Sequence, residues 1–221
     1  MRLLPLFPLP VVLFPGAPLP LHIFEPRYRR LLDDCLRGDG ELGMIYRAED
    51  DDEELLQSGR IGCVARVTQS EMLSDGRSNV IVRGIRRFTF HRYVVTDAPY
   101  RVGEVSDFDD DDAEPLIAPA QVDVVREMFE RLGRAARDIA DDTDPLPELP
   151  RDPSLVSFAI AGYVGLDLEH RQRLLASRSA RERLREIEAL LARAVHPMET
   201  QAAVHRRAGS NGHGPTLVDG T

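Results

Sequence analysis

The 221-residue sequence contains no lysine, because arginine accounts for all 28 of its Lys and Arg residues. A P-loop needs a lysine ammonium on the nucleotide phosphates, a Ser-Lys protease dyad needs a lysine as its base, and Schiff-base catalysis needs one as its nucleophile. The absence of lysine therefore excludes these three chemistries from this chain.

Cysteine is also scarce, since Cys35 and Cys63 are the only two thiols. They form no CxxC pair and no Cys/His cluster at the spacing of zinc ligands, which excludes a disulfide scaffold and a structural zinc site of the usual kind. This usage is typical of the reducing cytosol. We therefore expect a cytoplasmic protein with no metal and no cofactor.

A long uninterrupted apolar helix is missing as well. Residues 3–21 are almost entirely apolar, but the run contains six prolines: Pro5, Pro8, Pro10, Pro15, Pro18 and Pro20. Proline interrupts the helix that a signal-peptide core or a membrane span requires. The sequence therefore predicts neither a targeting segment nor a transmembrane segment.

Positive charge is in the minority, because the formal net charge is -9. Such a balance disfavours a general binder of nucleic acid or anionic membranes, which concentrates cations against phosphates. Two acidic runs, residues 49–54 and 107–114, hold 12 of the 21 acids in residues 1–114, and we expect both to be solvated loops. Outside them, 9 acids stand against 14 arginines, so a local basic face stays open.

The first 105 residues show the alternation and turn signals of short strands. We expect strands at residues 3–7, 11–14, 19–24, 42–46, 61–68, 79–82, 88–95 and 100–105. One helix is expected at residues 26–36, with Pro26 at its first position and Glu25 interacting with its amide end. This content predicts a small β-barrel domain over residues 1–114.

After the second acidic run the apolar spacing changes to about 3.6 residues. A first helix is predicted by the stripe Val122, Val125, Met128, Phe129, Leu132, Ala136 and Ile139. Asp152, Asp167 and Ser179 are N-cap candidates for three more helices, and Ser179 forms a capping box with Glu182. We expect a helical bundle over residues 115–196 and a disordered, polar tail over residues 197–221.

Catalytic motifs are absent: the sequence has no G-x-S-x-G elbow, no H-E-x-x-H and no D-x-D-x-D-G calcium loop. Composition alone leaves a triad of distant Ser, His and Asp open. His22 and Cys35 could form a nucleophile pair, but Cys35 falls on the apolar stripe of the helix at 26–36, which favours a buried structural thiol. We expect a protein without enzymatic activity.

Two motifs are more specific. Residues 4–28 read L-P-L-F-P-L-x-x-V-L-F-P-G-x-x-L-P-L-x-I-F-E-x-R-Y, and residues 80–88 contain V-x-G-x-x-R-F. Between them, Gly62-Cys63-Val64-Ala65 gives a hydrophobic-G-x-x-A strand. Together these segments resemble the amino-terminal substrate-binding domain of Lon proteases, and the resemblance covers about residues 3–195.

The resemblance implies an α+β fold, with a small PUA-like β-barrel followed by a C-terminal helical bundle. It also implies a freestanding relative without the Lon ATPase and protease modules. In full-length Lon enzymes this domain helps to engage polypeptide substrates and to assemble the oligomer. The implied clients are therefore unfolded or hydrophobic polypeptide segments. As an adaptor in protein quality control, the chain would also bind a protease or chaperone, and it could assemble with further copies of itself.

The candidate binding residues are Phe14, Phe24, Tyr28, Met44, Arg83 and Arg86. Aromatic residues such as Phe7, Phe14 and Phe24 would fit a barrel core equally well, or would line an apolar groove. The arginines beside Gly84, which are Arg83, Arg86 and Arg87, fit either ion pairing within the protein or an anion site. Binding of RNA or small anions to the barrel is therefore the alternative function.

Overall fold

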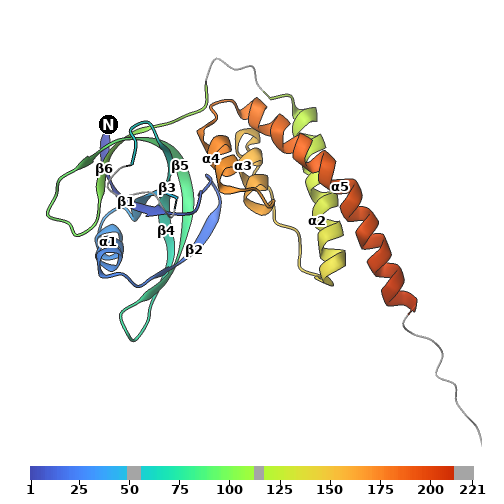
Figure 1. Ribbon diagram of the computed structural model, residues 1–221, viewed down its shortest axis with the longest axis horizontal. Coiled ribbons are helices and arrows are strands. Elements are labelled where there is room, and N and C mark those ends of the chain that lie inside the picture. The colour runs from blue at the N-terminus through green and yellow to red at the C-terminus, as the bar shows by residue number, and fades with distance from the viewer. Residues whose placement is uncertain (49–55, 112–116, 212–221) are drawn as a thin grey trace, which may run out of the picture. The chain divides into compact units, whose positions relative to one another are not determined.

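A computed structural model describes residues 1–48, 56–111 and 117–211 (Figure 1). The predicted acidic loop at 49–54 and the second run beyond Asp111 lie outside the described residues. The chain divides into two compact units, Met1–Pro115 with Pro150–Arg183, and Leu116–Leu149 with Leu184–Thr221.

The first unit is built on a closed β-barrel. Its strands are β1 (Arg2–Leu9), β2 (Pro18–Ile23), β3 (Glu41–Tyr46), β4 (Ile61–Met72), β5 (Ser78–Val94) and β6 (Val102–Asp107). The described strands pair in the order β2-β5-β4-β3-β1-β6, and a further pairing of β5 with β6 closes five of them into a ring. β1 and β3 are parallel, whereas the other pairs are antiparallel.

β5 is long enough to serve two neighbours. Its first half pairs with β2 and its second half with β6, so the two strands predicted at 79–82 and 88–95 are one. The predicted strand at 11–14 is not formed. Instead, Phe14 and its neighbours lie against Gly84 of β5, where a Cβ would come within 2.1 Å of the Phe14 carbonyl oxygen.

The barrel wall is buried on both sides, because alternate residues of a strand point to opposite faces. Inside the ring lie Leu4, Leu6, Ile45, Val64, Phe88, Phe90 and Val105, which come from all five closed strands. A second cluster joins the outside of the wall to helix α1 (Pro26–Arg37) and includes Phe7, Ile23, Tyr28, Leu31, Leu32, Met44, Cys63 and Val82. The continuous apolar stretches of β3 and β4 follow from this double burial.

The ends of α1 are only partly as predicted. Pro26 opens the helix, and the Gly38 N–H donates to the carbonyl oxygens of Asp34 and Cys35 at its end. The Glu25 side chain makes no cap hydrogen bond, contrary to expectation, because its carboxylate accepts from Arg27 Nε at 2.9 Å.

The predicted N-cap side chains of the later helices are present, whereas the Ser179 N–H donates to Ser177 Oγ and not to the Glu182 carboxylate of the predicted capping box. Asp152 accepts from the Ser154 N–H before α3 (Pro153–Tyr163), and Asp167 accepts from the His170 N–H before α4 (Leu168–Ala176). Ser179 Oγ accepts from the Glu182 N–H at the start of α5 (Ala180–Asn211). Among the helices of the described residues, none is long and apolar enough to cross a membrane.

Helices α3 and α4 belong to the same compact unit as the barrel, which differs from the predicted boundary at residues 114 and 115. A buried ionic cluster accounts for this grouping. Asp110, just after β6, contacts Arg87 of β5 at 2.5 Å and Arg183 at 2.6 Å. Arg183 also donates to Ser157 of α3, and its guanidinium lies 4.2 Å from the centre of the Phe158 ring.

The second unit pairs α2 (Pro119–Ala140) with the part of α5 beyond Leu184. Arg131 of α2 binds Glu199 of α5 through two hydrogen bonds, and Arg206 pairs with Asp138. Residues 197–211 are therefore helical, whereas the sequence predicted a disordered tail from residue 197. The helix continues through Pro197 and buries Ala202, so packing outweighs the missing proline N–H.

Candidate functional site

A candidate binding surface of the first unit lies where β2, β5 and β4 run side by side. Directly opposed residues of paired strands place their side chains on the same face. The registers form two cross-strand rows, Pro20–Ile81–Gln69 and His22–Asn79–Glu71. A third row contains Pro18, Arg83 and Arg66. We call the surface formed by the first two rows the outer face.

A hollow of about 570 Å³ lies over the outer face, within the size range of sites that accept small ligands or side chains. It is lined by Pro20, Leu21, His22, Gln69, Ser70, Glu71, Asn79, Val80 and Ile81. The lining combines proline and aliphatic residues with polar ones. Val80 and its β2 neighbour Leu21 also pack onto the core cluster, which holds this part of the lining in place.

An aromatic side chain extends this surface beyond the end of β2. Phe24 is 58% exposed, and its ring stacks on that of His22 with the centroids 6.2 Å apart. His22 Nδ1 is hydrogen-bonded to Asn79 Oδ1 at 2.8 Å, which fixes the imidazole over the strands. The hollow and the exposed Phe24 ring are therefore adjacent.

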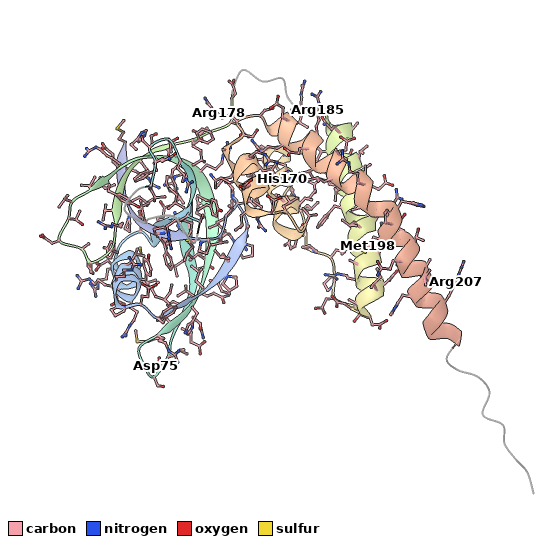
Figure 2. The ribbon with its side chains drawn as sticks, in the orientation of Figure 1. Asp75, His170, Arg178, Arg185, Met198 and Arg207 are labelled. Atoms are coloured by element: carbon pink, nitrogen blue, oxygen red, sulfur yellow. The ribbon has the colours of Figure 1, made fainter. Side chains whose placement is uncertain are left out.

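The hairpin that joins β4 to β5 projects beyond the barrel (Figure 1), and Figure 2 labels Asp75 at its turn. Met72, the last residue of β4, is 73% exposed near this turn. Asp75 pairs with Arg77, so the two charges of the turn neutralise each other. Met72 pairs with Ser78, whose β2 partner Ile23 is buried, so the Met72 side chain lies on the opposite face from Glu71 and outside the outer face.

Three of the six predicted binding residues are buried. Phe14 stacks on Phe158 with centroids 5.5 Å apart. Tyr28 packs against Phe7, and Met44 belongs to the cluster beneath α1. Met44 lies on β3, Tyr28 on α1 and Phe14 in the segment between β1 and β2, and each occupies a core position because it packs against the barrel or its helices. Only Phe24 among the predicted aromatic candidates reaches the outer face.

The predicted arginines are not brought together. Arg83 is exposed and donates to the Gly16 carbonyl oxygen at 2.8 Å. Arg86 donates two hydrogen bonds to the buried carboxylate of Glu41, whereas Arg87 turns to Asp110. Arg86 and Arg87 are therefore engaged in two separate internal ion-pair networks.

Glu41 is the centre of the first network. Its side chain, 4% exposed, also accepts hydrogen bonds from Arg2 and Arg66. Hydrogen bonds from Arg86, followed by those from Arg2 and Arg66, outweigh burial and lower the pKa of Glu41 to about 2. Strands β1, β3, β4 and β5 each contribute one charged residue to this network, which sequence spacing could not reveal.

The two cysteines are core residues. Burial raises the pKa of both thiols to about 12, which keeps them protonated. Cys35 Sγ donates to the Glu41 carbonyl oxygen, while His22 is bound to Asn79, so the two do not form a nucleophile pair. Across the described ranges, no group of three His, Cys, Asp or Glu side chains could hold a metal ion.

The architecture defines an α+β class, a small PUA-like barrel followed along the chain by helices. Residues 3–193 match the family model of the ATP-dependent protease La (LON) substrate-binding domain. The chain belongs to this family, as the opening motif and the V-x-G-x-x-R-F strand indicate.

Curated relatives are Lon proteases. The chain is 24% identical over 209 residues to Lon protease of Cytophaga hutchinsonii, covering 92% of this chain and 26% of the relative. It is 28% identical over 185 residues to Lon protease of Xanthomonas oryzae, covering 82% and 22% respectively. The chain therefore spans about a quarter of the length of these relatives.

Solved structures agree on the fold. A Lon N-terminal domain protein from Xanthomonas campestris superposes with a TM-score of 0.64 and 26% identity, over 86% of this chain and 98% of that one. The N-terminal domain of a Mycobacterium avium complex Lon protease gives 0.60 at 21% identity, over 86% and 98%, and supports the fold alone.

Proposed function

We propose that this chain binds exposed hydrophobic segments of unfolded polypeptides on its outer face, without catalysis. The observation that carries the proposal is the hollow on that face, with Pro20 and Ile81 in its lining and the exposed Phe24 ring beside it. Membership of a substrate-binding domain family supports the same role.

The physical argument rests on burial. An apolar client side chain seated between Pro20 and Ile81 would leave water, and Phe24 offers a second apolar contact at low entropic cost because it is already stacked on His22. Folded proteins keep such side chains inside, so they offer little to the hollow. The outer face therefore discriminates unfolded from folded chains.

The test compares binding of the full chain to a reduced and alkylated model protein and to the same protein in its folded form. We expect binding of the unfolded form alone. Ile81→Asp should weaken that binding about tenfold, since it replaces an apolar side chain of the lining with a charged one. Val95→Asp is the matched control, because Val95 is fully exposed outside the hollow.

Equal, negligible binding of both forms would sink the proposal, and so would equal losses in the two variants. Incubation with a casein-type substrate, with and without ATP, should yield no cleavage products. Within the cell we propose an adaptor role in protein quality control. A pull-down with the full chain should recover a protease or chaperone, and Ile81→Asp should lose clients while keeping that partner.

A further inference from the structure

Resting on the proposed function, we infer that the outer face selects extended segments in which an apolar side chain lies two positions from a lysine or arginine, and that it holds them by their side chains rather than by strand addition. Two independent features of β2, β5 and β4 carry this inference: the chemistry of the β2 edge and the spacing of the rows.

The first feature is the free edge of β2. Within the described residues β2 pairs with β5 alone, so its other edge is where a client strand could add. The Ala17 carbonyl oxygen accepts from the Gly84 N–H of β5, so strand alternation turns the backbone of residues 18, 20 and 22 toward the free edge. Pro18 and Pro20 have no N–H to donate there. Among these three edge residues, only His22 has a backbone N–H that could donate to an added strand. An added strand would therefore lose most of the donors that it needs.

The second feature is the distance between an apolar row and an acidic row. Pro20–Ile81–Gln69 and His22–Asn79–Glu71 are two residues apart along each strand, or about 7 Å. Side chains i and i+2 of an extended client also share one face at about that spacing. An apolar residue over Ile81 therefore places the residue two positions away over the row of Glu71.

The charge of that row favours a basic partner. Glu71 is exposed, and none of the described residues forms an ion pair with it, whereas Asp75 and Arg77 neutralise each other at the turn. Arg83 lies two rows from Glu71, at about 13 Å, beyond the range of strong interaction at physiological salt. A lysine or arginine of the client would thus meet a carboxylate, and an aspartate or glutamate would be repelled.

The test uses fluorescein-labelled peptides and the full chain at about 150 mM salt, where charges about 13 Å apart are screened, with anisotropy as the readout. The parent peptide is Gly-Ser-Phe-Ser-Arg-Ser-Gly, and a second peptide has glutamate in place of arginine. We expect the parent to bind about fivefold tighter, since an exposed attraction is exchanged for a repulsion. A third peptide, N-methylated at both serines that flank phenylalanine, should bind within about twofold of the parent. If the peptide bound by strand addition, each blocked hydrogen bond would weaken its affinity about fivefold.

Glu71→Gln should abolish the difference between the arginine and glutamate peptides, while Glu169→Gln, an exposed carboxylate on α4, should preserve it. The inference is overturned if the unmodified chain binds the arginine and glutamate peptides equally well. It is also overturned if N-methylation abolishes binding of the peptide. In both cases the proposed function stands as long as unfolded protein still binds. If neither the peptides nor the unfolded protein bind, the proposed function itself fails.

Discussion

A single buried carboxylate holds four strands of the barrel together. Glu41 is surrounded by Arg2, Arg66 and Arg86, and its pKa falls from 4.5 to about 2 on folding. A carboxyl whose pKa is lowered by folding stabilises the protein above its unfolded pKa, and that stability is lost as pH falls toward the folded pKa. The contribution is therefore present above about pH 4.5 and disappears toward pH 2.

Glu41→Gln is expected to lower the free energy of unfolding at pH 7 by about 3 kcal/mol, because three arginines lose their shared anion. Urea unfolding followed between pH 7 and pH 2.5 should show the difference from the unmodified protein shrinking below about pH 4.5. Glu71→Gln, on the exposed outer face, should change stability little. A Glu41→Gln deficit that is the same at every pH would contradict the assignment.

Gly84 is the residue that lets the 11–14 segment approach β5. A Cβ there would lie 2.1 Å from the carbonyl oxygen of Phe14, and backbone atoms cannot simply rotate away. Gly84→Ala should therefore destabilise the protein by about 1–3 kcal/mol. Gly162 of α3 has open space around its Cβ position, so Gly162→Ala should be neutral or stabilising by helix propensity. Thermal unfolding of the two variants compares them directly; similar melting temperatures would show that the contact is not restrictive.

At the scale of elements, features with local causes could be predicted from the sequence. The caps at Asp152, Asp167 and Ser179 each depend on a residue within three positions, and the Pro26 helix follows from its apolar spacing. The sequence predicts two strands where β5 is continuous, and the contact between Gly84 and the Phe14 backbone, 70 residues away, is recorded in no local pattern. Phe14 and Phe24 both belong to the opening motif at residues 4–28. Phe14 is buried and Phe24 is exposed because of their tertiary surroundings, which the motif does not record.

α5 beyond Pro197 provides an element-scale prediction. Residues 198–211 follow a proline in a polar sequence, yet Glu199 pairs with Arg131 and Ala202 is buried. Deletion from Met198 onward should therefore lower the melting temperature by about 2–4 °C, as expected for a loss of roughly 1 kcal/mol. Circular dichroism at 222 nm follows both the melting and the lost helix. An unchanged melting curve would show that this part of α5 adds nothing to the packing of α2.

At the scale of the molecule, the chain returns to its first unit after an intervening helix. Residues 116–149 belong to the second unit, whereas α3 and α4 rejoin the barrel. Asp110 connects the returning segment, because it binds Arg87 of β5 and Arg183 at the start of α5, 23 and 73 residues away. Arg87 is the arginine of the V-x-G-x-x-R-F motif, but no sequence pattern links it to Asp110 or to Arg183. The sequence therefore predicts a boundary near residue 114.

Loss of the Asp110 charge should therefore loosen α3 and α4 from the barrel before the barrel itself unfolds. Asp110→Asn leaves two buried guanidiniums without their shared carboxylate and should lower the free energy of unfolding by about 3–5 kcal/mol. Hydrogen exchange should increase first in α3, where Ser157 and Phe158 contact Arg183, while β3 and β4 stay protected. Asp97→Asn, at an exposed position, is the control. If exchange rises equally in strands and helices, the cluster stabilises the unit as a whole and α3 and α4 do not form a separable layer on the barrel.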